Sequence, residues 1–186
     1  MSEWTLENKT ALITGGSKGI GLAIVNEFLC LGAEVFFVAR TQNDVLKIIN
    51  KNKEANLHGI IADVSTDEGR EKVYYIIKTR AKKLDFLVNN VGTNIRKKSV
   101  EYTADEYDKI MNTNLKAAFE ITKNLYPYLK KSKDGSVVNI ASVSGLASTS
   151  SGVVYGMTKA AMIQMTRYLA VEWAEEKIRV NAIAPW

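Results

Sequence analysis

The chain has 186 residues, which suffices for one well-packed domain and is short for two, so we expect a single domain over residues 1–186. Apolar residues make up 46% and charged residues 24%, a balance that is typical of globular proteins and excludes a disordered or fibrous chain. The net charge of +5 comes from Lys and Arg scattered along the chain, so we interpret short basic clusters, such as residues 96–98, as solvated surface and expect no nucleic-acid partner.

The N-terminal stretch Met1–Asn8 carries acidic residues and lacks the basic-then-apolar layout of a secretory signal. No apolar run approaches the roughly 20 residues that cross a bilayer. We therefore expect a cytoplasmic protein without a membrane span.

From Thr10 onward, strand-like and helix-like patterns alternate, which indicates an α/β fold. The near-continuous hydrophobicity of the strand-like runs is typical of strands buried on both faces. Right-handed crossovers then predict a doubly wound, Rossmann-like parallel sheet of six strands, with helices on both faces and ligands at the carboxyl ends of the strands. The six runs are Thr10–Thr14, Glu34–Ala39, Leu57–Ala62, Phe86–Asn89, Ser136–Ala141 and Arg179–Ala184.

Three of the intervening stretches carry clear helical patterns. Gly19–Leu31 has apolar residues at helical spacing and is followed by Gly32, a typical C-terminal stop. Thr103 is a good N-cap for a helix that continues to about Lys130, and the last helix runs from about Val153 to Glu176.

Between the first strand and the first helix lies a glycine-rich loop, Thr14–Gly21. Its glycines at 15, 19 and 21 allow a tight turn, the approach of backbone N–H groups to a pyrophosphate, and close packing of helix on sheet. Three glycines in seven residues could be only a flexible loop. Their position between a strand and an amphipathic helix favours nucleotide binding.

Two single residues are expected to be structural. Cys30 is the only cysteine, so it allows no intrachain disulfide and no cysteine cluster for a metal, and we expect a small apolar side chain on a buried helix face. His58 is the only histidine and sits near a strand start, where a structural role is favoured over catalysis.

The end of the second strand indicates which nicotinamide cofactor is used. NAD-preferring sites usually place Asp or Glu there for the ribose 2′-hydroxyl, whereas this chain has Ala39 followed by Arg40. A guanidinium can pair with a 2′-phosphate, Lys18 can add a second positive charge, and Ser17 can add a hydroxyl donor. Either cation alone could be an ordinary solvated charge, but both together without a carboxylate predict NADP(H).

The motifs that follow resemble the short-chain dehydrogenase/reductase family in order and position. Asp63-Val64 resembles the pair that contacts the adenine ring, and Asn89-Asn90-Val91-Gly92 matches the family's Asn-Asn-Ala-Gly element with one change. Asn112-Thr113-Asn114, Ser142 and Tyr155-Gly156-Met157-Thr158-Lys159 complete the pattern. The resemblance implies a nucleotide-binding oxidoreductase whose cofactor residues are Gly15, Ser17, Lys18, Gly19, Ile20, Gly21, Arg40, Asp63, Val64, Asn90, Gly92, Tyr155 and Lys159.

Tyr155 and Lys159 are four residues apart on an expected helix, so their side chains share one face. A free phenol is a poor base at neutral pH, and a nearby ammonium favours its phenolate. Tyr155 is therefore the expected proton donor in carbonyl reduction, and Ser142 the group that hydrogen-bonds the same oxygen. Both would contact the substrate.

The resemblance further implies that Lys159 holds the nicotinamide ribose and that Asn114 supports a relay water. The hydride comes from the cofactor, so no metal and no covalent nucleophile are expected. The alternative interpretation is that Tyr155 is only a packed ring, Lys159 a surface charge and Ser142 a turn residue. We interpret four other tyrosines as such structural residues, namely Tyr102, Tyr107, Tyr126 and Tyr128. The accompanying motifs favour catalysis at Tyr155.

Within the family, the stretches 4–6, 143–145 and 173–174 are similar to tropinone reductase-like members, which reduce cyclic or bulky ketones. Reductases of 3-oxoacyl groups on acyl carrier protein share the same core and stay open. After Pro185 the family usually continues into further elements, so a C-terminal part of the pattern is expected to be missing. A non-catalytic NADP-binding fragment or scaffold is therefore the alternative from another class.

The segment Ser148–Ser151 is interpreted as a mobile stretch of small residues near the substrate. The helices 103–130 and 153–176 are expected to pack against their copies in a homodimer or homotetramer, as they do in relatives.

Overall fold

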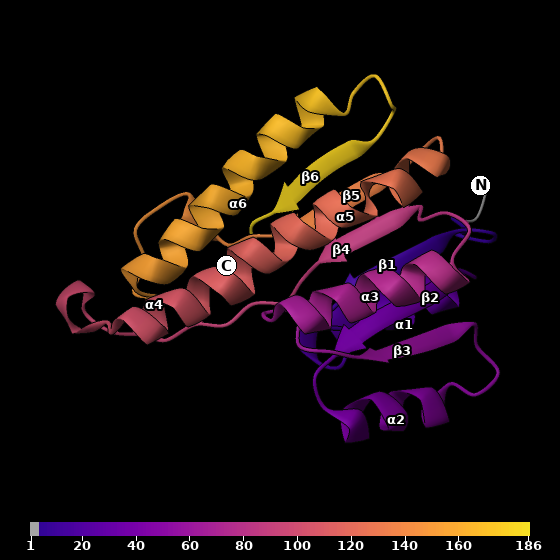
Figure 1. The fold of residues 1–186 in the computed structure, drawn as a ribbon, viewed down its shortest axis with the longest axis horizontal. Coiled ribbons are helices and arrows are strands. Elements are labelled where there is room, and N and C mark those ends of the chain that lie inside the picture. Colours follow the sequence, from indigo (N-terminus) through magenta and orange to yellow (C-terminus); the bar gives the residue numbers. More distant parts are fainter. Residues whose placement is uncertain (1–3) are drawn as a thin grey trace.

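The computed structural model describes residues 4–186, so the first three residues of the stretch Met1–Asn8 lie outside the described range. Its centre is one parallel sheet of six strands in the order β3-β2-β1-β4-β5-β6 (Figure 1). The strands are β1 (Thr10–Thr14), β2 (Glu34–Ala39), β3 (Leu57–Ile61), β4 (Phe86–Asn89), β5 (Ser136–Ile140) and β6 (Arg179–Ile183). The predicted doubly wound sheet is confirmed.

The order of the strands places a switch point between β1 and β4. From β1 the chain moves outward through β2 and β3, and then returns to the other side of β1 with β4. In register, Leu12 of β1 lies between Phe36 of β2 and Leu87 of β4, and none of the three side chains is accessible to solvent. Loops that follow β1 and β4 diverge at this point, which is where doubly wound sheets bind their ligands.

Helices cover both faces of the sheet (Figure 1). On one face, α1 (Gly19–Cys30) and α2 (Gln42–Lys51) pack through Val25, Val45 and Ile48 onto strand residues such as Ile13 and Phe37. The inward side chains of α1 and α2 are branched aliphatics, which pack closely on a pleated surface. Each fully buried side chain of this size contributes about 1.5–3 kcal/mol relative to exposure.

The opposite face is covered by α3 (Asp67–Arg80), α5 (Ala117–Lys131) and α6 (Val153–Glu172). Ile77, Leu125 and Leu169, one from each helix, belong to a single core cluster with the strand residues that point to this side. Strand residues alternate between the two clusters, which is why the strands themselves are apolar at almost every position.

The long helix predicted from Thr103 is interrupted. It consists of α4 (Ala104–Met111), a π-helical turn at Asn112–Lys116, and then α5. The predicted N-cap is confirmed, because Thr103 accepts the Glu106 N–H at 3.2 Å while the Glu106 carboxylate accepts the Thr103 N–H at 3.1 Å. Spacing alone did not predict the π-helical turn.

Several boundaries differ by a few residues from those predicted. β3, β5 and β6 each end one residue earlier, α1 ends at Cys30, and α6 ends at Glu172 instead of Glu176. The prediction for Cys30 is wrong, because this side chain is exposed. Helical spacing placed it near the apolar stripe of α1, but in that last turn Phe28 and Leu29 pack against the core and Cys30 lies on the solvent side.

His58 lies at the β2–β3 edge with structural contacts. Its ring stacks on Phe36 with centroids 4.5 Å apart, and its Nε2 lies 3.1 Å from the Glu34 carboxylate. Over residues 4–186, no helix has both the length and the apolar character that a membrane crossing requires.

Candidate active site

The glycine loop between β1 and α1 is shaped by close backbone approach. Gly15 and Gly19 have φ values of +68° and +55°, which glycine adopts without strain. A Cβ on Gly21 would lie 2.2 Å from the Gly15 carbonyl oxygen, so only glycine fits where the helix turns back onto the loop. A Cβ on Gly19 would meet nothing within 4 Å, so this position faces open space.

The first turn of α1 presents backbone donors to that space. Lys18 is the N-cap and forms no side-chain cap, and the first turn contains no acidic residue. The leading N–H groups of a helix have no partner within the helix and carry a partial positive charge. An open, uncapped N-terminus beside a glycine loop suits a pyrophosphate group, as predicted for Gly15, Gly19 and Gly21.

Asn90, directly after β4, joins the glycine loop to the centre of the sheet. Its side-chain amide donates to the carbonyls of Thr14 and Gly15 at 3.0 and 3.1 Å, and its backbone N–H donates to the Thr14 hydroxyl at 3.0 Å. The second asparagine of the Asn-Asn-Val-Gly element therefore fixes the position of the loop, in addition to lining the cavity beside it.

Asn89, the first asparagine of that element, lies in the core. Its amide donates to Thr122 of α5 and to Asn139 of β5, both at 2.8 Å, and the Asn139 amide donates to Thr166 of α6 at 2.9 Å. This buried polar chain links two strands and two helices directly beneath the carboxyl edge. It explains an asparagine where strand hydrophobicity alone would favour an aliphatic residue.

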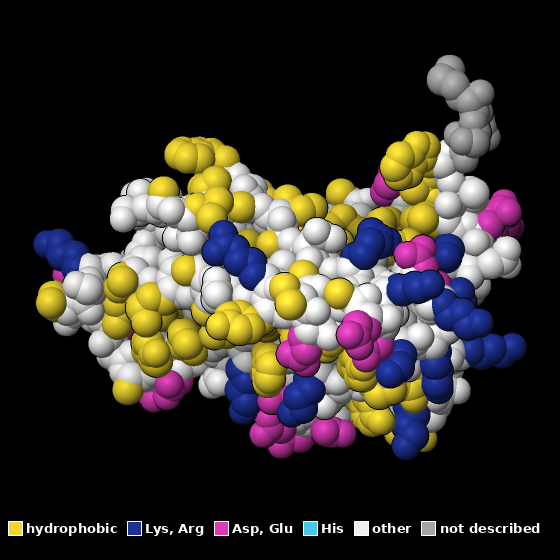
Figure 2. Space-filling view, turned by 90° about the horizontal axis from the view of Figure 1, so that it is seen from above, with side chains coloured by type: hydrophobic (Ala, Val, Ile, Leu, Met, Phe, Trp, Pro, Cys, Tyr) yellow, Lys and Arg dark blue, Asp and Glu magenta, His cyan; other side chains and the backbone are white. Residues whose placement is uncertain are grey.

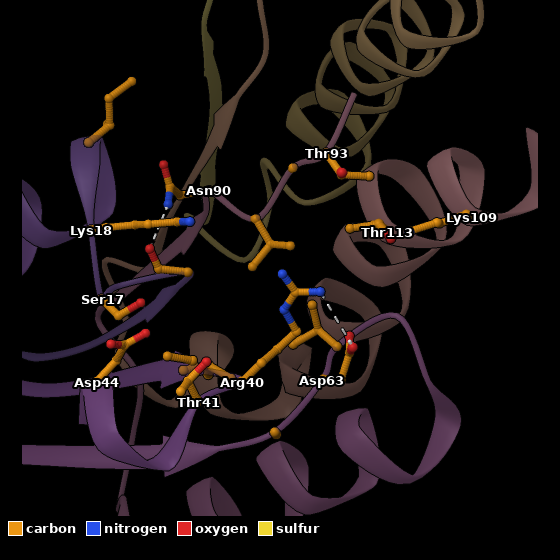
Figure 3. A pocket seen from close by; sticks show the side chains of 18 residues that line it. Ser17, Lys18, Arg40, Thr41, Asp44, Asp63, Asn90, Thr93, Lys109 and Thr113 are labelled. Atoms are coloured by element: carbon orange, nitrogen blue, oxygen red, sulfur yellow. Dashed lines mark hydrogen bonds and ion pairs between the residues drawn. The ribbon is translucent and has the colours of Figure 1, made fainter. Parts of the chain in front are cut away.

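A cavity of about 310 Å³ opens at the carboxyl ends of β1, β2, β3 and β4 (Figure 3). Most of the predicted cofactor residues line it, namely Gly15, Ser17, Lys18, Ile20, Arg40, Asp63, Val64, Asn90 and Gly92. Gly19 and Gly21 belong to the adjoining loop, while Tyr155 and Lys159 line the neighbouring cavity described below. The fold thus brings together four separate loops that the sequence could only place at strand ends.

Charged side chains gather in this cavity. Figure 3 shows the Lys18 ammonium and the Arg40 guanidinium both reaching into it. Arg40 lies 3.9 Å from the Asp63 carboxylate, and both side chains are substantially exposed, so this ion pair adds little stability and leaves the guanidinium able to move. The Asp63 carboxylate also accepts the backbone N–H and hydroxyl of Ser65, which fixes its turn.

Sequence reasoning missed several residues of the cavity. Asp44, in the first turn of α2, brings a carboxylate beside Ser17 and Thr41 (Figure 3). The prediction considered only the end of β2, at Ala39. Asp44 follows five residues later, and the first turn of α2 places its carboxylate in the cavity. Lys109 of α4 also lines the cavity and had no local motif to indicate it. Thr113 lines it as well, and the sequence placed this residue in the Asn112-Thr113-Asn114 motif without assigning it a contact with the cofactor.

A second cavity of about 540 Å³ adjoins the first, and four residues line both cavities, namely Ile20, Asn90, Gly92 and Thr93. Ser142, Tyr155 and Lys159 all line it, as predicted from their positions after β5 and on α6. The two cavities therefore form one elongated site along the carboxyl edge of the sheet. Its first part is lined by the glycine loop and its second part by the predicted proton donor.

Lys159 is almost completely buried, with 3% of its surface exposed. Its Nζ donates to the Ile140 carbonyl at 2.7 Å and lies 5.7 Å from the centroid of the Tyr155 ring. Burial lowers the pKa of Lys159 from 10.5 to about 8, because desolvation disfavours the ammonium. The lysine is thus held beside the tyrosine at a pKa close to neutrality.

Asn114 lies in the π-helical turn and is fully buried. Its oxygen accepts the Thr93 N–H at 2.7 Å, and its amide donates to the Thr93 carbonyl at 2.9 Å and the Thr158 hydroxyl at 3.1 Å. Both amide protons are therefore used, so a water could contact this residue only through an oxygen acceptor. Thr158, not singled out from the sequence, connects Asn114 to the helix that carries Tyr155.

Ser142 stands at the end of β5 and is 9% exposed. It caps a short 3₁₀ turn, Val143–Gly145, by accepting the Ser144 N–H at 3.2 Å, and its hydroxyl donates to the Ser144 hydroxyl at 3.3 Å. The serine is thus oriented by its own turn and stands within the same cavity as the tyrosine.

Comparisons with known proteins agree with this geometry. The family model described as short chain dehydrogenase matches residues 9–186. A tropinone reductase homologue of Arabidopsis thaliana is 47% identical over 98% of this chain and 70% of its own length. A tropinone reductase homologue of Datura stramonium is 39% identical over 98% of this chain and 69% of its own.

Solved structures share the fold. L-sorbose reductase from Gluconobacter frateurii, in complex with NADPH and L-sorbose, superposes with a TM-score of 0.93 at 30% identity, over 98% of this chain and 70% of its own. A Pseudomonas aeruginosa RhlG structure, an active-site complex with NADP, has a TM-score of 0.91 at 33% identity over 98% and 73%. The chain thus spans about 70% of the length of these proteins.

Proposed function

This chain belongs to the short-chain dehydrogenase family, and we propose that it is an NADPH-dependent oxidoreductase that interconverts a carbonyl compound and its alcohol. The observation that carries this proposal is the continuity of the two cavities. A dinucleotide laid along the first, past Asn90 and Gly92, would place its far end beside Tyr155 and Lys159.

The cofactor end of the proposal rests on the shape and charge of the first cavity. The glycine loop and the first turn of α1 would hold the pyrophosphate, Asp63 and Val64 the adenine, and Lys18 and Arg40 the 2′-phosphate. When bound, NADPH would supply the hydride. L-sorbose reductase and RhlG, which share this fold, are described in complexes with NADPH and NADP, which supports the choice of NADP(H).

The proton chemistry is assigned to residues of the second cavity. Tyr155 donates a proton to the substrate oxygen in reduction, and Ser142 hydrogen-bonds the same oxygen as its negative charge develops. Lys159, near the tyrosine and with a pKa of about 8, stabilises a phenolate and binds the nicotinamide ribose. Asn114 holds the loop at Thr93 and one end of a water relay.

We propose a ketone as the substrate, which is supported by the names of relatives and structural neighbours, tropinone reductase homologues and L-sorbose reductase. A non-catalytic scaffold remains the alternative from another class. The buried Lys159 beside Tyr155 argues against such a scaffold. Burying an ammonium without a carboxylate partner costs stability, and a scaffold would gain no activity in return.

The decisive experiment titrates the chain with NADPH and NADH and then adds a panel of cyclic ketones. We expect NADPH to bind much more tightly than NADH, and loss of absorbance at the nicotinamide band on adding ketone. Tyr155→Phe should lower the rate by about 10²–10⁴-fold without changing NADPH affinity more than a few-fold. Binding without turnover would favour a scaffold, and absence of NADPH binding would contradict both.

We also propose that the chain forms a homodimer or homotetramer through α4–α5 and α6. An apolar groove lies between these helices, with Met111, Leu115, Phe119 and Met165 among its lining residues. In the view of Figure 2, hydrophobic side chains gather toward the end of the molecule where α4 and the start of α6 lie. A monomer mass in light scattering at micromolar concentration would contradict this assembly.

We propose a cytoplasmic location. One relative from Arabidopsis thaliana is named as chloroplastic, so imaging of a fluorescent fusion should distinguish cytoplasmic from organellar signal.

A further inference from the structure

Three hydroxyl side chains form a closed ring on the wall of the second cavity. Ser144 and Thr149 have their oxygens 2.8 Å apart, Thr149 donates to Ser151 at 2.9 Å, and Ser151 donates to Ser144 at 2.9 Å. The Ser142 hydroxyl joins this hydroxyl ring at Ser144, at 3.3 Å. All four side chains line the cavity that also contains Tyr155.

The segment that carries the hydroxyl ring is fastened at both ends. The Asn94 amide donates to the Ser151 carbonyl at 2.8 Å, which ties the segment to the loop after β4. Gly152, with φ +97°, packs so closely on the Tyr102 hydroxyl that a Cβ there would lie 2.5 Å from it. At the other end, a Cβ on Gly145 would lie 2.6 Å from the backbone of Lys159. The hydroxyl ring is therefore pre-organised by the loops around it.

Hydrogen-bond accounting shows what the hydroxyl ring can offer a ligand. Each hydroxyl has one proton and two acceptor lone pairs. The three protons are used inside the ring, and Ser151 keeps a lone pair that no hydrogen bond uses. A ligand hydroxyl can donate to that lone pair, or it can replace one member of the ring and accept its proton. An apolar ligand surface can do neither, and it would leave the Ser151 lone pair without a partner.

The position of the hydroxyl ring relative to the catalytic serine limits where that ligand hydroxyl sits. Ser142 and Ser144 are 3.3 Å apart, which is similar to the separation of two oxygens on adjacent carbons. When the Ser142 hydroxyl donates to a substrate carbonyl oxygen instead of to Ser144, it frees a lone pair of Ser144, and a hydroxyl on the neighbouring carbon of the substrate can donate to it.

The main alternative substrate is an oxo acid, whose carboxylate a cationic side chain in the cavity would favour. Arg96 also lines the cavity, and no Asp or Glu side chain does among the described residues. Arg96 is exposed, however, and lies outside the hydroxyl ring, whereas the four hydroxyls are connected to one another and to the catalytic serine. The recognition elements of the hydroxyl ring are thus neutral.

We propose that the substrates of this site are hydroxylated carbonyl compounds, α-hydroxyketones above all, whose hydroxyl groups are bound by Ser144, Thr149 and Ser151. This inference rests on the proposed reductase function and adds the substrate class to it. It assigns Thr149 and Ser151 as residues that determine specificity, outside the set that was predicted from the sequence.

The test compares 2-hydroxycyclohexanone with cyclohexanone, which share a ring and differ in one hydroxyl. With NADPH, we expect kcat/KM to be at least ten-fold higher for the hydroxyketone. Thr149→Val, which keeps the side-chain shape, and Ser151→Ala should each lower that ratio several-fold, mainly through KM. The ratio is insensitive to partial unfolding, because unfolded chain lowers both rates equally. Ser148→Ala, an exposed serine of the same segment outside the cavity, is the matched control and should leave the ratio unchanged.

A binding measurement separates recognition from turnover. In the Tyr155→Phe variant saturated with NADPH, the hydroxyketone should change nicotinamide fluorescence at a concentration about ten-fold below that of cyclohexanone. Equal or better use of cyclohexanone would overturn the inference and leave the proposed function intact. Preference for 2-oxohexanoate that is lost in Arg96→Gln would also overturn it, in favour of an oxo acid. Absence of any Tyr155-dependent turnover would overturn the proposed function itself and the inference with it.

Discussion

At the scale of the residue, Lys159 lowers the stability of the fold while it is proposed to serve the reaction. Its ammonium is buried, its only described hydrogen bond is to the neutral Ile140 carbonyl, and its pKa is lowered by burial to about 8. Between about pH 8 and 10.5 the unfolded chain therefore binds more protons at this position than the folded chain, so the free energy of unfolding rises with pH across that window.

We predict that Lys159→Met, which fills the same space without charge, stabilises the chain by about 2 kcal/mol at pH 7. The gain should shrink toward pH 10.5, where the native lysine has lost its proton. Urea unfolding at pH 7 and pH 10 measures both values, and the variant should have no measurable ketone turnover. An unchanged or lower stability at pH 7 would contradict the burial cost, and Lys47→Met, on the exposed side of α2, serves as the control.

Arg40 and Asp44 lie at the same end of the first cavity and have opposite expected effects on NADPH affinity. The Arg40 guanidinium favours a 2′-phosphate, and the Asp44 carboxylate disfavours it. We predict that Arg40→Gln weakens NADPH binding by about ten-fold or more and changes NADH binding little, since it removes a charge-assisted partner of the 2′-phosphate. Asp44→Asn should strengthen NADPH binding a few-fold by removing a like charge.

Fluorescence titration of both nucleotides measures these effects. Lys47→Gln makes the same charge change as Arg40→Gln on an exposed position of α2 outside the cavity, so it controls for net charge. If Lys47→Gln and Arg40→Gln have equal effects, Arg40 makes no specific contact and the assignment is wrong.

At the scale of the element, the turn from β1 into α1 depends on two glycines for different reasons. Gly21 has no room for a Cβ because the Gly15 carbonyl lies 2.2 Å from that position, whereas Gly19 has space and only a positive φ. We predict that Gly21→Ala costs about 2–3 kcal/mol of stability and abolishes NADPH binding, because α1 must move away from the loop.

Gly19→Ala provides the matched comparison, and it should cost only about 1 kcal/mol, the penalty of a left-handed backbone with a Cβ. Urea unfolding of both variants, followed by NADPH titration, distinguishes the two mechanisms. Equal costs would mean that the loop relaxes freely and that the tight packing at Gly21 is unimportant.

At the scale of the whole molecule, the edge of the sheet opposite the site is held by a buried carboxylate. Asp85, fully buried before β4, accepts the Thr10 N–H at 2.8 Å, the Lys83 ammonium at 2.9 Å and the Ser132 hydroxyl at 2.6 Å. Burial opposes its ionisation, but the hydrogen bonds from Ser132, Lys83 and Thr10 outweigh burial, so the pKa of Asp85 is lowered.

We predict that Asp85→Ala destabilises the chain by about 2–3 kcal/mol, because it leaves three donors from separate elements without their acceptor. The stability that Asp85 gives is complete above the ordinary carboxyl pKa and is lost as the pH falls through the lowered value, so the wild-type advantage should shrink in acid. Asp134→Ala, at an exposed ion pair with Arg179, should change stability by less than about 0.5 kcal/mol. Comparable losses for the two variants would contradict this role of Asp85.

The sequence by itself determined the six strands along the chain, three of the helices, and the positions of the glycine loop, Asp63, Asn90 and Ser142 at strand ends. These features depend on local patterns: continuous apolar runs, helical spacing, glycine loops and the Thr103 cap, which the structure places within a few residues of their expected bounds. The single-domain expectation and the catalytic roles stay predictions, to be tested by the variants above.

Only the tertiary structure decided how these strand ends meet. Asn94 and Ser151 are 57 residues apart and Asn114 and Thr158 are 44 apart, so no local pattern could pair them. The entry of Asp44 into the cofactor cavity, the exposure of Cys30 and the burial of Lys159 depend on which neighbours pack around each side chain. The hydroxyl ring that suggests a substrate class forms within the loop after β5, but its place on the cavity wall depends on the tie from Asn94 in the loop after β4, which no local pattern indicates.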